Sequence, residues 1–563
     1  MAVPPQPTPV MPVTPTPRLS AIPQSLHGLD NRGIEAGAIP GGGFGRFGRM
    51  FDFFARPIPD AVLQVIATAM IKEDVSKPIN EEEPTDENPT IPAGYTYFGQ
   101  FIDHDISLDP TPLSTKANDL AAMQDFRSPA LDLDCVYGRG PDDQPYMYSD
   151  GLHLRIGKPL TSGAPHGGSF DVLRLDTGGP SHPAILGDKR NDENRIVVQV
   201  QALFIAFHNK VVDDHALIAA AGGDFSNDLS RFRTAAAVVR WHYQWLVVND
   251  YLRRILETGS IAAVWNNGTP NLPLYDRANP PFAYMPVEFA GAAYRFGHSM
   301  VRPGYALNNA IGGKAADFPE RIPIFSRDAA ATANFNGFGI PMPPTWGIDW
   351  AYYLDNMATG HVTAGSVVPQ RSYRIDANLV QPLGDLPEFR DRGSPFFNLA
   401  YRNLARGANN LRLPSGEQVA HALGIVPLTA DILWGAGSKA LTTALEATFP
   451  DDKKADLKEV RDRRAKVLPF AQPGQPLNAN TPLWYYILRE GEYYGFDRVD
   501  EGLTKGFGGH HLGPVGSRIV AETFIGLLWH DSMSYLRRWP NFTPMLPSAG
   551  ASFTLADVVR YAL

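Results

Sequence analysis

The chain has 563 residues, 44% hydrophobic and 19% charged, which is ordinary globular composition and enough for several average domains or one large helical core. A net charge of −9 with dispersed lysines and arginines argues against a nucleic-acid-binding surface, and a single cysteine, Cys135, excludes an intramolecular disulfide framework. No apolar run reaches the roughly 18 residues that span a bilayer and no standard secretory signal is visible, so we expect a soluble protein without a transmembrane segment, cytoplasmic or exported by a non-standard route.

The N-terminal segment 1–26 carries proline at nearly every second or third position, which favours extended polyproline conformation and cannot build a core. We therefore predict a disordered tail over 1–26 and a single domain over 27–563. The acidic stretch 81–87 is typical of a solvated loop. Residues 128–190 are rich in glycine, proline, aspartate and serine, and we expect them to be irregular.

Beyond residue 190, apolar side chains recur mainly at helical spacing. Two long helices are predicted, over 193–215 and 229–256. Shorter helical patterns cover 284–300, 416–424, 429–448, 451–466 and 517–537. No series of alternating strands stands out, so the sequence predicts a mainly α-helical fold with long irregular loops and very little β-structure.

The most informative stretch is Gly99-Gln100-Phe101-Ile102-Asp103-His104-Asp105, which sets polar groups in an aromatic, apolar neighbourhood. In a helix, Gln100, Asp103 and His104 stand at i, i+3 and i+4 and share one face. Asp105, rotated by roughly 100°, points elsewhere. Three interpretations are open: a satisfied polar cluster or surface turn, a hydrolytic metal site built on the His-Asp pair, or a haem pocket. The metal site would need further His and Asp ligands at helical spacing, which we do not find.

Three more segments offer matching chemistry. Arg190 and Glu193 stand three apart at a predicted helix start, where such a pair is more often a cap or an ion pair. Gly297 precedes His298 and would permit a flat ligand to approach that histidine. Asn403 offers an amide on a probable helix. Each has an ordinary structural explanation when it is taken alone.

A fourth segment, 128–134, alternates oxygen-bearing groups along a loop, as binding of a hard cation requires. Its aspartates could equally be turn formers.

Taken together and in this order, the motifs closely resemble those of the animal-type haem peroxidases, the superfamily of myeloperoxidase, lactoperoxidase, peroxinectin and, more distantly, the cyclooxygenases and fatty-acid dioxygenases. The resemblance covers roughly 27–540 and is nearest in style to the bacterial branch. Gln-Phe-X-Asp-His-Asp is its most specific motif, and Arg-X-X-Glu and Arg-X-Gly-His support it.

The resemblance implies three catalytic residues. His104 matches the distal histidine, which takes a proton from peroxide and returns it to the leaving oxygen. Gln100 matches the distal glutamine that hydrogen-bonds solvent or halide. Arg190 matches the distal arginine, a permanent cation that stabilises developing negative charge.

The resemblance also implies haem b as the cofactor. His298 matches the proximal iron ligand and Arg295 a partner of a haem propionate. Asn403 matches the residue that accepts a hydrogen bond from the proximal imidazole. Asp103 and Glu193 match the carboxylates that can form esters with the haem.

One Ca²⁺ is implied beside the distal helix. Its expected ligands are Asp105, Ser128, the carbonyl of Ala130, Asp132 and Asp134. Three carboxylates would leave this loop at net −1 with calcium bound and strongly repulsive without it.

The chain departs from the mammalian members at several positions. Asn194 stands where myeloperoxidase has a methionine bonded to haem, so that link cannot form. Ser128 and Asp134 stand where mammalian members have threonine and serine.

The leading functional prediction is a haem peroxidase that reduces hydrogen peroxide while oxidising small organic donors, halide or thiocyanate, as in a response to oxidative stress. The alternative is a fatty-acid dioxygenase, whose radical tyrosine stands three residues before the proximal histidine. Here that position is Arg295, with Tyr294 one residue further away. A second alternative is a non-catalytic haem- and calcium-binding adhesion module, which would need neither His104 nor Arg190.

Overall fold

The structure is a computed structural model that describes residues 45–563 with gaps, so the predicted tail over 1–26 lies outside the described residues. The gaps are 73–85, 109–123, 126, 162–168, 267, 279–282, 313–320, 327–333, 358–368, 388, 390–394, 436–450, 495–507, 549 and 551.

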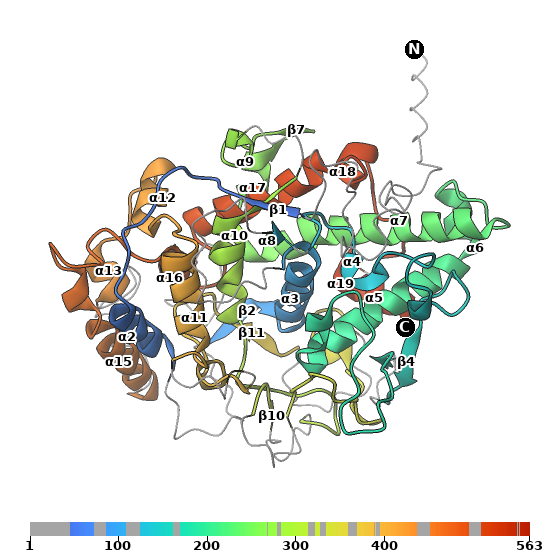
Figure 1. The fold of residues 1–563 in the computed structure, drawn as a ribbon, viewed down its shortest axis with the longest axis horizontal. Helices are drawn as coiled ribbons and strands as arrows, with labels where there is room; N and C mark the ends of the chain where they lie inside the picture. Colours follow the sequence, from blue (N-terminus) through green and yellow to red (C-terminus); the bar gives the residue numbers. More distant parts are fainter. Residues whose placement is uncertain are drawn as a thin grey trace.

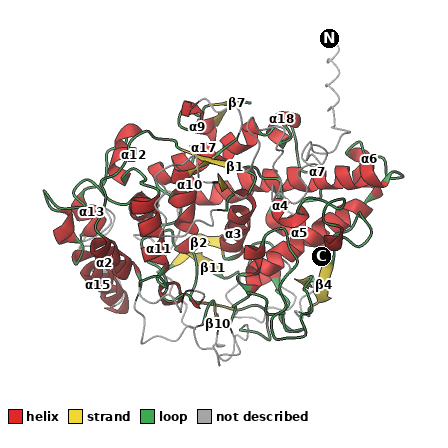
Figure 2. Ribbon diagram, viewed as in Figure 1, coloured by secondary structure: helices red, strands yellow, loops and turns green. Residues whose placement is uncertain are grey.

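The fold is mainly helical, which confirms the predicted class (Figures 1 and 2). The helices are α2 (Asp60–Met70), α3 (Gly94–Ile106), α4 (Asp134–Tyr137), α5 (Arg195–Asp213), α6 (His215–Ala220), α7 (Asp228–Leu246), α8 (Leu252–Ile255), α9 (Ser260–Val264), α10 (Val287–Gly291), α11 (Leu399–Ala405), α12 (Gly416–Ala422), α13 (Ala430–Trp434), α15 (Asp451–Ala465), α16 (Leu483–Tyr494), α17 (Pro514–His530), α18 (Tyr535–Arg538) and α19 (Leu555–Ala562). Two short 3₁₀ segments matter below, η4 (Lys189–Asp192) and η7 (Ala293–His298), and so do two π segments, η5 (Val247–Tyr251) and η11 (Arg406–Asn410).

The strands are short and form small separate sheets. They are β1 (Gly45–Gly48), β2 (Glu87–Pro92), β3 (Gln124–Asp125), β4 (Ile156–Pro159), β5 (Phe170–Val172), β6 (Trp265–Asn266), β7 (Thr269–Pro270), β8 (Met285–Pro286), β9 (Gly304–Tyr305), β10 (Ile322–Pro323) and β11 (Arg371–Tyr373). Strand β1 pairs antiparallel with β3 and parallel with β8. The other pairs, β2–β11, β4–β5, β6–β7 and β9–β10, are antiparallel.

The two long predicted helices are largely buried and pack against each other. Helix α5 packs against α7, α3 and α19, and its buried face includes Ile196, Val200 and Phe207. By length and composition α5 could cross a membrane, but 83% of that stretch is buried inside the protein, as expected of a core helix. Buried apolar side chains from Phe47 to Val559 form one continuous cluster around these helices.

A π turn, η5, interrupts the second long helix after Leu246 and changes the helix face on which the following side chains lie. Its Asp250 accepts hydrogen bonds from Oη of Tyr95 (2.6 Å), the backbone nitrogen of Leu555 (3.0 Å) and Nε of Arg254 (2.8 Å). Asp250 thereby ties α3, α8 and α19 to one point. The last η5 residue, Tyr251, faces Gly99 of α3, where an added Cβ would lie 2.3 Å from the Tyr251 hydroxyl. Only glycine permits this approach.

Three predicted segments differ from expectation. The pattern over 517–537 is not one helix but α17 followed by α18. The pattern over 284–300 is not one helix but α10 followed by η7, because Ala292 leaves the helical conformation (φ −144°, ψ −68°). The region 128–190 is largely irregular as predicted, yet it contains α4 and the β4–β5 pair. Of the helical pattern over 429–448, the part from 436 onward lies outside the described residues.

Candidate functional site

A cavity of about 350 Å³ lies between two groups of elements. We call α3, η4 and the start of α5 the His104 wall, and η7, α11 and η11 the His298 wall. The residues predicted for catalysis or cofactor binding all line this cavity: Gln100, Asp103, His104, Arg190, Glu193, Arg295, His298 and Asn403. The structure therefore brings together, from four distant segments, every residue that the sequence proposed for these two roles.

His104 is a buried residue of α3 whose ring reaches the cavity. Its Nδ1 lies 2.7 Å from Oδ1 of Asn191, and its Nε2 bonds to no residue that the structure describes. Burial first, and then the positive charge of Arg190, lower the pKa of His104 to about 4. The ring is therefore neutral near pH 7 and can accept a proton at the cavity.

Arg190 in η4 is held beside His104 by several acceptors. Its Nε and Nη2 contact the carboxylate of the buried Asp188 at 2.8 to 3.2 Å. Its Nη2 also donates to the backbone oxygens of His104 (3.1 Å) and Ser107 (2.6 Å) near the end of α3. The remaining nitrogen, Nη1, bonds to no described residue. A fixed cation thus stands next to the neutral imidazole.

Gln100 is oriented by two neighbours on the same wall. Its Nε2 donates to Oε2 of Glu193 (3.1 Å), and its Oε1 accepts from Nδ2 of Asn194 (3.1 Å). The other end of the Asn194 amide caps α5, because Oδ1 accepts from the backbone nitrogens of Ile196 and Val197. The departure noted at Asn194 therefore has a structural role as a cap that also fixes Gln100.

His298 contacts Asn403, but not in the expected sense. Nδ2 of Asn403 lies 2.9 Å from Nδ1 of His298, while Oδ1 of Asn403 accepts from Nη1 of Arg295 at 3.0 Å. An arginine can only donate, so the amide oxygen turns to Arg295 and the NH₂ group turns to the imidazole. The predicted acceptance by Asn403 is thus reversed: the amide donates to His298. Burial, followed by the charge of Arg295, lowers the pKa of His298 to about 3.

The rest of the His298 wall can hold a flat anionic ligand. An added Cβ at Gly297 would meet open space, so the chain leaves room directly before His298. Two arginines that the sequence analysis did not assign, Arg402 and Arg406, line the cavity together with Arg295. Their i, i+4 spacing was the available signal. An imidazole, an open glycine and three guanidinium groups fit a planar metal-bearing ring with carboxylate groups, such as haem.

Behind the His104 wall, three buried carboxylates form the predicted cation site. One ligand oxygen each from Asp105, Asp132 and Asp134 lie within 4.8 Å of one another. Burial, and then mutual repulsion, raises the pKa of Asp105 well above its usual range, and burial also raises that of Asp134. Oδ1 of Asp105 and Oδ2 of Asp134 are buried without a hydrogen-bond partner. This donor set fits a hard divalent cation.

The other two predicted cation ligands lie in the same turn. Oγ of Ser128 donates to both carboxylate oxygens of Asp132 at 3.0 Å, and the nitrogen of Ala130 donates to the carbonyl of Ser128 at 2.7 Å. Leu133 adopts the left-handed conformation (φ +58°), and its nitrogen donates to Oδ2 of Asp105 at 3.1 Å. The strained turn therefore connects the loop to α3.

A buried arginine links this loop to the cavity. Nη1 of Arg127 donates to Oδ1 of Asp134 (2.9 Å), and its Nη2 contacts Oδ2 of Asp188 (2.8 Å), the same side chain that holds Arg190. Arg127 is 1% exposed. No sequence pattern points to this residue, since its partners lie up to 61 positions away.

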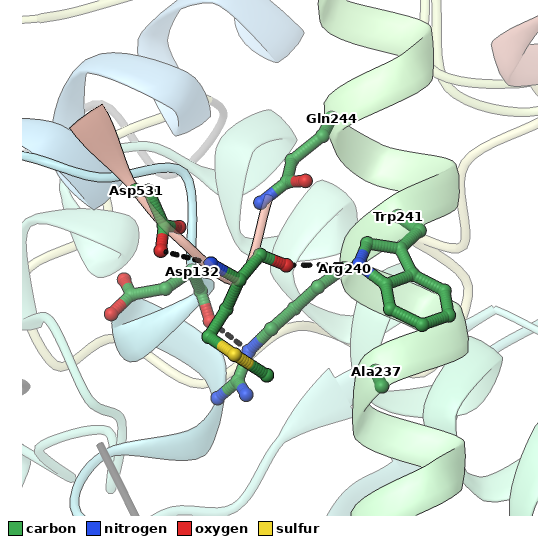
Figure 3. A pocket seen from close by; sticks show the side chains of 7 residues that line it. Asp132, Ala237, Arg240, Trp241, Gln244 and Asp531 are labelled. Carbon is green, nitrogen blue, oxygen red and sulfur yellow. Dashed lines mark hydrogen bonds between the residues drawn. The ribbon is translucent and has the colours of Figure 1, made fainter. Parts of the chain in front are cut away.

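Helix α7 holds the loop from the far side (Figure 3). Nε of Arg240 donates to the backbone oxygen of Asp132, and Nε2 of Gln244 donates to that of Leu131 at 2.8 Å. The pocket drawn there is only about 20 Å³, with room for a water molecule rather than a substrate. This pocket lies where α7 supports the loop 128–134, which we call the cation loop.

Comparisons with known proteins bear on the fold. No curated protein sequence matches the chain. Peroxidase A from Dictyostelium discoideum has a similar structure, with a TM-score of 0.53 and 15% identity over 93% of this chain and 94% of that chain. Oryza sativa fatty acid alpha-dioxygenase, in a variant with palmitic acid, gives a TM-score of 0.50 and 14% identity over 91% of this chain and 79% of that chain. At such identities these two likenesses concern the fold alone.

The sequence model described as "Animal haem peroxidase" matches residues 128–332. That segment holds the cation loop, Arg190, Glu193 and His298. The match shows that residues 128–332, less than half of the chain, are similar to the animal haem peroxidase family, and the structural comparisons add a similar fold.

Proposed function

We propose that this chain is a haem-dependent peroxidase with one domain over 27–563. With small organic donors it reduces hydrogen peroxide to two molecules of water, and the donors supply two electrons while two protons are taken up. With halide or thiocyanate, one peroxide oxygen passes to the anion and one proton is taken up, which gives the corresponding acid and one molecule of water. The observation that carries the proposal is His104, a neutral buried base with a free nitrogen on the cavity and a fixed cation beside it. Membership of the animal haem peroxidase family is part of this proposal, and placement in its bacterial branch stays a prediction.

Haem b would be held by the His298 wall. His298 would bind its iron, and Arg295, Arg402 and Arg406 would suit its carboxylates. When bound, the haem supplies the redox chemistry, while the chain supplies orientation and electrostatics. Asp103 and Glu193 line the same cavity and are the residues we propose for ester links to it.

Metal ligation by Nε2 of His298 requires that Nδ1 carries the proton. The Asn403 amide now presents NH₂ to that nitrogen, because Arg295 occupies its oxygen. If Arg295 moves to a haem carboxylate, the amide can turn and accept from Nδ1. Cofactor binding and orientation of the ligand histidine are then linked through one arginine.

Proton transfer is the task of His104. Its Nε2 takes the proton from one oxygen of hydrogen peroxide and returns it to the oxygen that leaves as water. Arg190 offsets negative charge that builds on the leaving oxygen, because its charge is permanent and already oriented. Gln100 presents an amide to the same space and suits binding of solvent or a halide.

The carboxylates of Asp105, Asp132 and Asp134 suit one Ca²⁺, which would fix α3 from behind. Ser128 and the carbonyl of Ala130 are proposed as further ligands from the same turn. The ion would remove the repulsion among three buried acids.

A fatty-acid dioxygenase is the second candidate, favoured by Tyr294, which lines the cavity and whose hydroxyl lies 3.3 Å from the carbonyl oxygen of Gly99. Against it stands the position three residues before His298, which is Arg295. A non-catalytic adhesion module has less support, because it has no use for a neutral base beside a cation.

The test is to add haem to the purified protein, record its absorption spectrum, and mix it with hydrogen peroxide in the presence of a one-electron donor. We expect one haem per chain, and donor oxidation that depends on peroxide. His298→Ala should lose stable haem, whereas His242→Gln, which changes a histidine away from the cavity, should keep it. Oxygen consumption with a fatty acid but no peroxide turnover would favour the dioxygenase, and absence of haem uptake would sink both.

A further inference from the structure

The free nitrogen of His104 depends on which tautomer the ring adopts. A neutral imidazole carries one N–H, and the other nitrogen is the base. For Nε2 to accept a proton at the cavity, the hydrogen must sit on Nδ1. The neighbour of Nδ1 is the amide of Asn191, 2.7 Å away and fully buried.

The direction of that hydrogen bond can be traced to a backbone group. Nε2 of Gln201 donates to the carbonyl oxygen of Cys135 at 3.2 Å, and a carbonyl can only accept. Oε1 of Gln201 therefore faces Asn191 and accepts from its Nδ2 at 2.7 Å. This leaves Oδ1 of Asn191 for His104, and an oxygen there requires Nδ1–H. Each amide in the chain has its orientation set by the one behind it.

We propose that Asn191 and Gln201 are positioning residues that hold His104 in its Nδ1–H tautomer and so keep Nε2 free as the base on the cavity. This inference rests on the proposed peroxidase function for its consequence, but not for its geometry. With the opposite tautomer, Nε2 would present a hydrogen to the cavity and could not take the proton of peroxide.

Burial makes this setting stable. Asn191 and Gln201 are both fully buried, so neither amide can turn to water for a replacement partner. If Asn191 alone turned over, its oxygen would face Oε1 of Gln201 and its NH₂ group would face the Nδ1 hydrogen of His104. One acceptor–acceptor contact and one donor–donor contact would then replace two hydrogen bonds. The chain of amides thus excludes the inverted arrangement rather than merely favouring the observed one.

The first test needs no cofactor. The protein is labelled with ¹⁵N in histidine, and the His104 signals are identified by their loss in His104→Ala. We expect the wild type to carry its proton on Nδ1, and Asn191→Leu or Gln201→Leu to show the Nε2–H form or a mixture. Gln199→Leu is the matched control, because Gln199 is another buried amide of α5 whose side chain, among the described residues, bonds to Arg195, Trp346 and Ile348. A wild-type ring protonated on Nε2, or an Asn191→Leu ring unchanged from wild type, would overturn the inference.

The second test uses the haem-loaded protein. Hydrogen peroxide and hydrogen cyanide must each give up a proton on binding, whereas carbon monoxide binding to the reduced protein needs no base. Asn191→Leu should slow the first two by about tenfold or more, toward the 10²–10⁴ range of a lost general base, and leave carbon monoxide binding unchanged. Gln199→Leu should change none of the three rates.

A far-ultraviolet circular dichroism spectrum of Asn191→Leu that matches the wild type guards against simple misfolding. Equal slowing of all three ligands in Asn191→Leu would mean a collapsed cavity and count against a positioning role. If the wild-type protein does not bind haem, only the proposed function is contradicted, because the ¹⁵N measurement still reports on the tautomer of His104. If the haem-loaded wild type and Asn191→Leu react with hydrogen peroxide at the same rate, only the present inference is contradicted.

Discussion

Four histidines of this protein have environments that resist protonation, yet they lie in two different kinds of place. His104 and His298 line the cavity, while His208 and His242 lie in the core on α5 and α7. Burial lowers the pKa of His104, His208 and His242 to about 4 and that of His298 to about 3. By pKa alone the cavity and the core cannot be told apart.

The difference lies in the second ring nitrogen. In the core, Nε2 of His208 meets the carbonyl of Leu152 at 2.9 Å and its Nδ1 meets the hydroxyl of Tyr137 at 3.2 Å. Both nitrogens of His242 are likewise bonded, to the carbonyl of Val238 and the nitrogen of Met545. The two cavity histidines bond only through Nδ1 to described residues. A lowered pKa therefore marks burial, and an open nitrogen marks a place for chemistry.

The largest expected difference between the cavity histidines and the core histidines is in the rate of reaction with peroxide. His104→Ala should slow the reaction of the haem-loaded protein with peroxide by about 10²–10⁴-fold, because the base is lost while His298 still holds the cofactor. His242→Gln should leave that rate within about threefold, since it removes no group of the cavity. Stopped-flow mixing measures both. A similar rate for His104→Ala and wild type would show that the open nitrogen of His104 does not act as the base.

A support residue behind the His104 wall should behave like the core, with loss of stability. Arg127→Met leaves the buried carboxylates of Asp134 and Asp188 without their shared cation and should lower the unfolding free energy by about 3–5 kcal/mol. Arg277→Met is the control, because its ion pair with Asp52 is exposed and should be worth about 0–1 kcal/mol. Urea titration monitored by circular dichroism measures the two. Equal small losses would show that the buried network contributes no more than a surface pair.

The core histidines should also make the fold acid-sensitive. The unfolded chain binds a proton at each near pH 6.5, while the folded pKa of His208 and His242 is about 4. Stability is therefore fully present above pH 6.5 and falls as the pH drops towards 4, by about 3 kcal/mol for each residue. His242→Gln, measured by thermal unfolding from pH 7.5 to 4, should be less stable at neutral pH but lose less on acidification. If stability changes with pH in this variant as it does in the wild type, His242 does not contribute to the acid sensitivity.

The smallest effect expected is that of the cation. Calcium at about 100 times its dissociation constant should stabilise the folded protein by about 2.7 kcal/mol, because the unfolded chain has no assembled site. Asp132→Asn should weaken the shift in melting temperature, whereas Asp431→Asn, on the separate helix α13, should not. If calcium and a chelator give the same melting temperature in wild type, the three aspartates do not form a working site.

Much of the fold and the cavity was accessible from the sequence. The helical periodicity of α5 and α7 is strong because both bury wide apolar faces, and the polar residues of α3 at i, i+3 and i+4 do share the cavity. What the sequence could not supply were contacts between distant segments. Arg127 and Gln201 look like ordinary polar residues until the fold sets them against Asp188 and Asn191. The π turn that ends at Tyr251 has no periodic signature in the sequence.

Asn403 shows a second limit of sequence reasoning. The residue was assigned to the correct neighbour, His298, but with the hydrogen bond in the opposite direction. An asparagine looks the same in sequence whichever end of its amide faces the histidine. Only the position of Arg295, 108 residues away, decides between the two.

The junction at Asp250 bears on the order in which the chain assembles. This carboxylate joins Tyr95, which lies 155 residues earlier, to the backbone of Leu555, which lies 305 residues later. Contacts over such separations form late, because long loops must close before they stabilise anything. During synthesis, α3 is therefore made long before its anchor at α19 leaves the ribosome. Helix α3, which carries His104, therefore gains this support only after residue 555 has been synthesised, so the cavity beside it reaches its final form late in folding.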